Sequence, residues 1–186
     1  MTVPVSSRAR TTPPLAYRPA RPDELVACAE IWRHSINDYI GRLNQPEVPA
    51  DTASLVRLYG HLQSTDPDRF VVATTPEPDA EGGERIVAFA AALMRERLWF
   101  LSMLFVLPEA QGMGVGRTLL EHVAPPAEGA AFRATATDTA QPISNALYAS
   151  VGIVPRVPLL NLIGTPTGVD AFGALPSGVT PVSLDL

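Results

Sequence analysis

The stretch that decides the fold is Gln111-Gly112-Met113-Gly114-Val115-Gly116-Arg117. It follows the apolar run Leu98 to Val106, which is typical of a strand, and precedes the amphipathic segment Arg117 to Val123, which is typical of a helix. A glycine-rich turn at a helix N-terminus leaves backbone N–H groups unpaired, and these attract anions together with the helix dipole. The sequence therefore predicts a turn that can hold a pyrophosphate.

The spacing of these glycines decides between phosphate-binding motifs. Glycines at 112, 114 and 116 do not match G-x-G-x-x-G, and the lysine and hydroxyl pair of a P-loop is missing. The pattern Q/R-x-x-G-x-G/A does match, through Gln111, Gly114 and Gly116. Here the chain resembles the GNAT acetyltransferase superfamily, whose members bind the pyrophosphate of acetyl-CoA at this turn. The alternative is a helix start whose glycines only permit a tight turn.

A second block, Ser144 to Ile153, resembles a later signature of the same family, a short helix ending in Leu-Tyr-x-x-x-Gly. The interval from Gly116 to Tyr148 leaves room for the rest of one helix and one strand. Two departures stand beside this match, because Gln141 occupies a position where the family often has asparagine and Ile153 replaces an aromatic residue. Taken alone, Tyr148 is more typical of an amphipathic core position.

The resemblance implies an α/β fold with a mixed, mostly antiparallel central sheet flanked by helices on both faces. It implies acetyl transfer from acetyl-CoA to a primary amine by direct attack, with no metal, and Tyr148 as the acid that protonates the leaving thiolate. It implies that main-chain groups before the turn pair with pantetheine, with an N–H near Val106 serving the oxyanion. The implied cofactor-binding residues are Leu104, Phe105, Val106, Gln111, Gly112, Met113, Gly114, Val115, Gly116, Arg117, Asn145 and Tyr148.

The general base is not evident. The predicted strand Trp99 to Val106 contains no carboxylate or histidine, only Ser102. An alkylamine with a pKa of ~10.4 is mostly protonated at neutral pH, so a site must lower that pKa or supply a base. The candidates elsewhere are Glu30, Asp38 and Asp138, whereas Glu109 belongs to the turn and is not assigned.

Composition limits the class of protein. The 186 residues are 46% hydrophobic and 18% charged, enough for one substantial core. No apolar run reaches the roughly 18 residues of a spanning helix and no signal peptide is evident, so we expect a cytoplasmic protein without membrane partners. The net charge of −5 argues against nucleic-acid binding and favours a small-molecule or peptide amine as partner. The sequence is compatible with a homodimer.

Cysteine and histidine give no metal-binding pattern. The lone Cys28 shares a helical face with Leu25 and Trp32, which favours a small core residue. The three histidines lie far apart in sequence, at His34, His61 and His122.

We expect a flexible arm over residues 1–14, an acetyltransferase domain over 15–163 and a tail over 164–186. Strands are predicted at Leu15 to Arg18, Phe70 to Thr74, Ile86 to Met94, Leu98 to Val106, Ala130 to Thr137, Val154 to Ile163 and Val179 to Leu184. Helices are predicted from an Asp23 N-cap to Ile36, from Asp51 or Thr52 to Leu62, over Val115 to Val123 and around Tyr148.

Two other functions stay open at this stage. One is a non-catalytic CoA-binding or regulatory module, half of a tandem or dimeric assembly, which the missing base and the apolar tail favour. The other is a nucleotide-phosphate binder that uses the same glycine turn.

Overall fold

The structure is a computed structural model that describes residues 14–79, 82–126, 128–160, 165, 167 and 177–180. The chain divides into two units, residues 1–154 and 155–186. All helices and strands of the described residues lie in the first unit.

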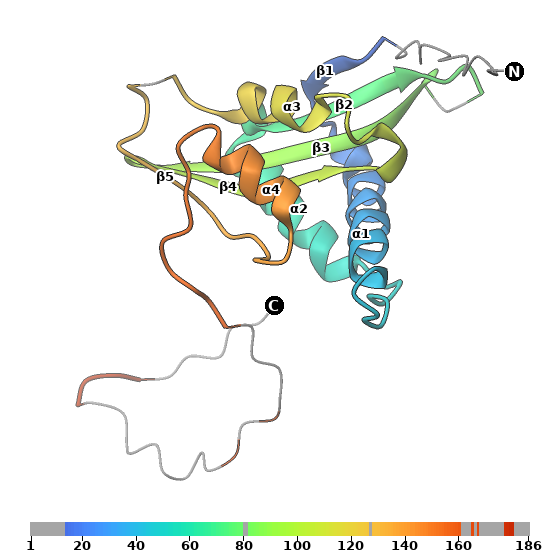
Figure 1. The fold of residues 1–186 in the computed structure, drawn as a ribbon. Helices are drawn as coiled ribbons and strands as arrows, with labels where there is room; N and C mark the ends of the chain where they lie inside the picture. Colours follow the sequence, from blue (N-terminus) through green and yellow to red (C-terminus); the bar gives the residue numbers. More distant parts are fainter. Residues whose placement is uncertain are drawn as a thin grey trace, which may run out of the picture. The chain divides into compact units, whose positions relative to one another are not determined.

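The described strands form one five-stranded sheet in the order β1-β2-β3-β4-β5 (Figure 1). The first four are antiparallel neighbours, and β5 pairs parallel with β4. The sheet is therefore mixed and mostly antiparallel, as the sequence predicts. The strands are β1 (Ala16–Pro19), β2 (Phe70–Pro76), β3 (Glu84–Arg95), β4 (Leu98–Val106) and β5 (Phe132–Thr135).

Helices cover both faces of this sheet (Figure 1). On one face, α1 (Leu25–Gly41) and α2 (Ala53–Thr65) pack through Cys28, Tyr59 and Leu62. On the other, α3 (Val115–Val123) and α4 (Pro142–Ala149) pack through residues such as Leu119 and Tyr148. Three short 3₁₀ turns complete the set, at η1 (Pro22–Glu24), η2 (Pro67–Arg69) and η3 (Pro108–Ala110).

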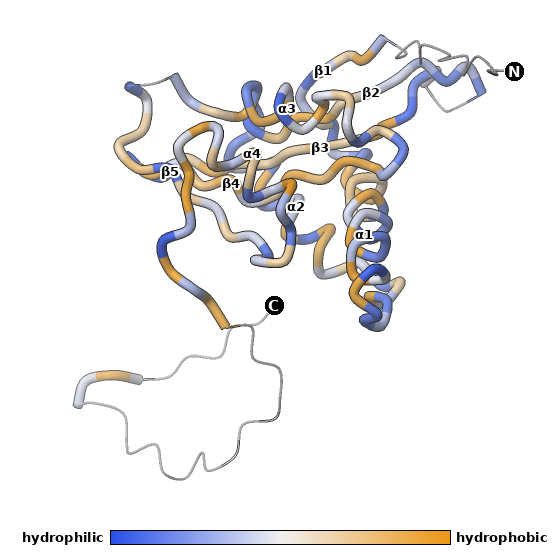
Figure 2. Tube along the Cα trace, in the orientation of Figure 1, coloured by the Kyte–Doolittle hydropathy of each residue, from blue (hydrophilic) through white to orange (hydrophobic). Residues whose placement is uncertain are grey.

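Alternation along the central strands sends side chains into two separate cores. In β2, Phe70 and Val72 face α1 and α2, whereas Val71 and Ala73 face α3. This is the period of two expected of a strand that is buried on both sides. Figure 2 shows the result as apolar residues concentrated along β3 and β4, while α1 alternates between apolar and polar residues.

Some local predictions differ from the structure. Asp23 is not a helix N-cap, because it lies inside η1, and Glu24 instead accepts a hydrogen bond from the Arg21 N–H at 2.7 Å. The strand predicted over Ala130 to Thr137 is shorter, at Phe132–Thr135.

Residues 154–160 do not form the predicted strand. Pro155 and Pro158 remove two N–H donors that a strand ladder needs. Residues 161–163 lie outside the described residues, as does most of the strand predicted over Val179 to Leu184, whose first two residues are irregular.

No helix of the described residues is long and apolar enough to cross a membrane.

Candidate acyl-CoA site

The end of β4 has a free edge beside the glycine turn. The parallel partner β5 pairs only with Leu98 to Leu101 of β4, and its last residue, Thr135, donates its hydroxyl to the Leu101 carbonyl at 2.9 Å. On the β3 side, Ala91 pairs with Met103 and Ala92 with Leu101, so Ser102 is the extra residue of a β-bulge. Beyond this bulge, Met103 to Val106 pair with β3 alone among the described strands.

The Val106 peptide is fixed with its polar atoms toward that free edge. Its carbonyl accepts hydrogen bonds from Ser35 Oγ at 3.2 Å and from Gln111 Nε2 at 2.9 Å. The next N–H along the chain, that of Leu107, donates instead to the Val87 carbonyl of β3 at 3.0 Å. Because N–H and C=O of one strand residue point the same way, the Val106 N–H also points away from β3. The Val106 N–H, which we expect from the sequence to serve the oxyanion, is thus not paired with β3.

The glycine turn has the backbone conformation that its sequence predicts. Gly112 and Gly114 adopt φ values of 77° and 81°, which side chains disfavour, and Gly114 is the N-cap of α3. A Cβ atom added at either glycine would meet no protein atom within 4 Å. The space beside these two glycines is therefore open, and the first N–H groups of α3 have no acceptor within the helix, which fits a bound phosphate group.

Tyr148 is held on α4 with only 7% of its surface exposed. Burial raises the pKa of its phenol, and the nearby Ser144 hydroxyl offsets this in part. The phenol therefore keeps its proton at neutral pH and can act as an acid.

One cavity of about 540 Å³ joins these features. Most of the predicted cofactor-binding residues line it, and they come from β4, the glycine turn and α4: Leu104, Phe105, Val106, Gln111, Gly112, Gly114, Val115, Gly116, Arg117 and Tyr148. The structure brings these ten together although the turn and Tyr148 lie far apart in sequence.

Two predicted residues do not line the cavity. Met113 is partly buried and packs against the core on the α3 face. Asn145 donates its side-chain amide to the carbonyls of Gln141 at 2.8 Å and of Asp138 at 3.2 Å, so it holds the loop before α4.

Sequence reasoning missed the contribution of α1. Ser35, Ile36 and Tyr39 line the cavity from this helix, and Thr135 to Thr137 line it from the end of β5. Ser35 and Tyr39 are four residues apart and so share one helix face. That spacing was visible in the sequence, but nothing in it indicates which strand the face meets.

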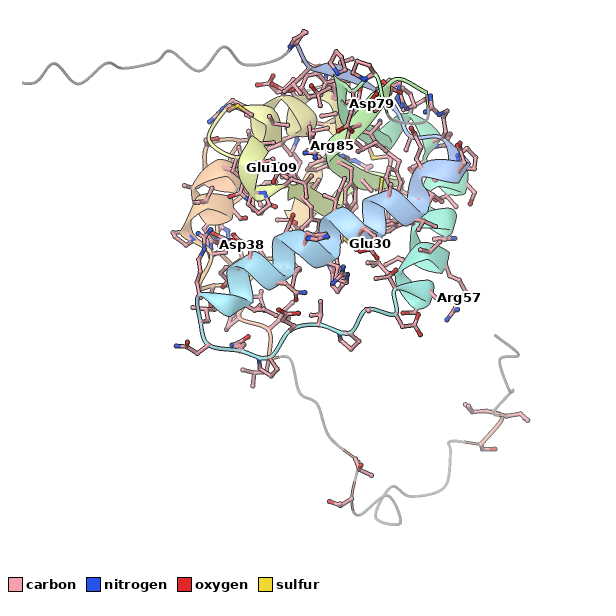
Figure 3. All side chains as sticks on the ribbon, turned by 90° about the vertical axis from the view of Figure 1, so that its right-hand side faces the viewer. Glu30, Asp38, Arg57, Asp79, Arg85 and Glu109 are labelled. Carbon is pink, nitrogen blue, oxygen red and sulfur yellow. The ribbon has the colours of Figure 1, made fainter. Side chains whose placement is uncertain are left out.

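The three base candidates occupy different places. Glu30 forms an ion pair with Arg33 at 2.9 Å, and Asp38 with Arg42 at 2.6 Å. Asp38 also lines a second cavity of about 530 Å³, together with Arg85 and Glu109. Figure 3 shows Glu30 and Asp38 along α1, with Arg85 beside Glu109.

The third candidate, Asp138, lines the first cavity. Of the three carboxylates, it alone shares a cavity with Tyr148.

The model of the acetyltransferase (GNAT) family matches residues 22–153, which contain both sequence motifs and the whole cavity. The chain belongs to the GNAT acetyltransferase family. No curated protein matches the sequence significantly.

Solved structures agree with this family in fold. A possible acetyltransferase from Clostridium difficile 630 has a TM-score of 0.56 at 15% identity, covering 82% of this chain and 98% of its own. Diaminobutyrate acetyltransferase EctA from Paenibacillus lautus, solved with its substrate and coenzyme A, has a TM-score of 0.54 at 16% identity, covering 75% of each chain. A transcriptional regulator from Bacillus halodurans C-125 has a TM-score of 0.55 at 17% identity, covering 81% of this chain and 99% of its own. At such identities the likeness shows the GNAT fold and leaves the substrate open.

Proposed function

We propose that the protein is an acetyl-CoA-dependent N-acetyltransferase that acts on a primary amine by direct attack. The observation that carries this proposal is the single cavity in which the free edge of β4, the glycine turn and Tyr148 meet. Each of the three has a separate chemical role in acyl transfer, and membership of the GNAT family supports the combination.

The residues of the cavity suit an acyl-CoA. The turn from Gly112 to Gly114 offers unpaired N–H groups and open space for a pyrophosphate, and the exposed Arg117 adds a positive charge beside it. The backbone of Met103 to Val106 offers the hydrogen-bonding edge that an extended pantetheine chain can join. Bound acetyl-CoA would supply an acetyl thioester whose carbonyl carbon the amine attacks.

The protein's part in the chemistry falls to two groups. The Val106 N–H donates to the carbonyl oxygen as negative charge develops there, and Ser35 and Gln111 hold that peptide in place. Tyr148 Oη gives its proton to the leaving sulfur, since a phenol of raised pKa is fully protonated at neutral pH. The nitrogen loses its proton to solvent water as the new C–N bond forms, and water returns a proton to the Tyr148 phenolate.

The test combines binding with turnover. Native mass spectrometry and calorimetry with acetyl-CoA, CoA and ATP identify the ligand, and a panel of primary amines identifies the acceptor. The panel contains an alkylamine, a diamine, lysine and a peptide N-terminus. We expect acetyl-CoA binding and acetylation of at least one amine.

Two other results would replace the proposal. Acetyl-CoA binding with no turnover on any amine indicates a non-catalytic CoA-binding module. Binding of ATP and not of CoA indicates a nucleotide-phosphate binder.

A further inference from the structure

Two polar side chains that line the cavity, Tyr39 and Asp138, have no role in the proposed acetyl-CoA site. Tyr39 reaches the cavity from α1, and Asp138 reaches it from the loop between β5 and α4. Among the described residues that line the cavity, Asp138 and Arg117 are the two charged side chains. Arg117 belongs to α3, on the other face of the sheet from α1. The cavity thus carries one cation at the glycine turn, Arg117, and one carboxylate in the loop before α4, Asp138.

The loop around Asp138 is held by several hydrogen bonds. Asp138 Oδ1 accepts the Ala140 N–H at 2.9 Å. Its main-chain carbonyl accepts the Gln141 N–H and the Asn145 side-chain amide, both at 3.2 Å. These bonds fix the backbone and one carboxylate oxygen.

Asp138 is exposed, and its second carboxylate oxygen is accessible to a ligand. Within the described part of the chain, Oδ2 accepts no hydrogen bond and Asp138 forms no ion pair. The other two base candidates differ in this respect, because Glu30 and Asp38 are each paired with an arginine. Asp138 thus brings an uncompensated negative charge to the cavity wall.

Tyr39 lies beside Asp138 in the cavity. Its hydroxyl is shielded from solvent and has no hydrogen-bond partner among the described residues. Burial, the negative charge of Asp138 and hydrogen bonding toward its carboxylate all raise the pKa of this phenol, so it remains a donor. A shielded hydroxyl without a partner is costly, and a small rotation toward Asp138 would satisfy it.

We propose that Asp138 binds the ammonium group of the acceptor, and that Tyr39 is a positioning residue for its carboxylate. This inference rests on the proposed function and narrows the acceptor to amines that are cationic at neutral pH. An ammonium group offers three N–H donors, which the free Asp138 oxygen and the Ser35 hydroxyl can accept from two sides of the cavity. A charge-assisted bond of this kind draws cations into the cavity in preference to uncharged amines. The bound ammonium ion loses one proton to solvent water, and the neutral amine then attacks the thioester carbonyl.

The decisive variant is Asp138→Asn. Asparagine keeps a side-chain oxygen for the Ala140 N–H and removes only the charge, so the loop should stay folded. With the best alkylamine of the panel, we expect the KM for the amine to rise by about tenfold or more. The kcat at saturating amine and the Kd for acetyl-CoA should stay within about twofold. With hydroxylamine, which is mostly uncharged at neutral pH, the KM should not change.

The matched control is Asp38→Asn, which removes a carboxylate next to Tyr39 in the α1 sequence but one that lines the other cavity. It should leave the KM for the amine unchanged. Tyr39→Phe is the second variant, used if Asp138→Asn lowers the melting temperature, and it should raise the same KM by a smaller factor.

A wild-type KM in both Asp138→Asn and Tyr39→Phe overturns the inference, as does an equal rise in KM for hydroxylamine. Such a result leaves the proposed function intact, because wild-type protein still acetylates the alkylamine. If wild-type protein binds acetyl-CoA and acetylates no amine, the proposed function itself fails and the inference falls with it.

Discussion

At the scale of single residues, Tyr148 has the most specific role in the proposed chemistry. Only the departing thiolate needs its proton, so Tyr148→Phe should lower kcat by about 10²-fold or more. The Kd for acetyl-CoA should change little, as measured by calorimetry. Because burial raises the pKa of this phenol, Tyr148 should stay protonated up to a pH above the pKa of an ordinary tyrosine. The wild-type kcat should therefore not fall through loss of this proton at a lower pH.

Tyr59→Phe is the matched control for this prediction. Tyr59 is fully buried in the core on the α1 and α2 face, and its hydroxyl has no partner among the described residues. Its removal should leave kcat unchanged. An unaltered kcat in Tyr148→Phe, under conditions where chemistry limits turnover, would exclude Tyr148 as the acid.

Ser35 has an indirect role through the Val106 peptide. The Ser35→Ala substitution removes one of the two side-chain donors to the Val106 carbonyl and leaves Gln111 as the other. The peptide should then hold its N–H less firmly toward the reacting oxygen, and kcat should fall by about tenfold, equivalent to ~1.4 kcal/mol. The Kd for acetyl-CoA should stay within about twofold.

Ser64→Ala removes a comparable hydrogen bond, from Ser64 Oγ to the His61 carbonyl at 2.9 Å in α2, away from the cavity. It should not affect kcat. An equal fall in kcat in the two serine variants would mean that the Ser35 hydrogen bond affects kcat only through the stability of the fold.

At the scale of elements, the glycine turn and the start of α3 form one unit for anion binding. Gly114→Asp places a carboxylate beside the phosphate site at a residue with φ of 81°. Repulsion and strain act in the same direction, so acetyl-CoA binding should weaken by about 2 kcal/mol or more. Gly114→Ala, which adds the strain without the charge, should weaken it less.

Calorimetry on both Gly114 variants measures this effect, with Gly60→Asp as the control. Gly60 lies in α2, and a Cβ there meets nothing within 4 Å. Wild-type affinity in a folded Gly114→Asp protein would remove the turn from the cofactor site.

The elements that sequence reasoning placed accurately are those with clear local boundaries. The runs Leu98 to Val106 and Val115 to Val123 are found with the predicted ends, because Pro108, the glycines and Pro125 end each pattern chemically. The run from Val154 was misassigned, because apolar composition outweighed Pro155 and Pro158 in the prediction. Local composition therefore predicted a strand or helix correctly only where the segment contained no residue, such as proline, that disfavours that element.

The sequence predicted the part of the cavity formed by the glycine turn and Tyr148, but not the part formed by α1. The motif residues from Gln111 to Arg117 and Tyr148 carry their own signal in sequence, and ten of the twelve predicted positions line the cavity. The α1 wall with Ser35 and Tyr39 depends on how a helix packs across β4, and that tertiary relation leaves no local pattern. The same holds for Asn145, whose amide turns to the loop at Asp138.

At the scale of the whole folded unit, a network of ion pairs joins β1, η1 and β3. Arg18 donates to both oxygens of Glu24, at 2.9 and 2.6 Å, and also pairs with Glu84. Glu24 retains 8% side-chain exposure and also accepts the Arg21 N–H. Although burial opposes it, the bonding from Arg18 and Arg21 lowers the pKa of Glu24. Asp66, bonded to Arg95 and to the Met94 N–H, likewise has a lowered pKa despite its burial.

These lowered pKa values predict how stability depends on pH. A carboxylate whose pKa is lower in the folded state stabilises the fold fully above its unfolded pKa, and that contribution is lost as the pH falls through the folded value. The melting temperature should therefore decline below about pH 4.5. Glu24→Gln leaves Arg18 without its bidentate partner and should cost about 3 kcal/mol at neutral pH. Its melting temperature should vary less with pH, so that the variant and wild-type curves approach each other in acid.

Glu109→Gln is the control, because its pair with Arg85 at 2.8 Å is largely exposed and should contribute less than about 1 kcal/mol (Figure 3). Thermal unfolding monitored by circular dichroism from neutral to acidic pH distinguishes the two variants. If Glu24→Gln is no less stable than Glu109→Gln at neutral pH, the buried network does not hold β1 to the sheet. If instead the two variants differ in melting temperature at neutral pH and reach the same melting temperature only in acid, protonation of Glu24 is the event that releases β1 from the sheet.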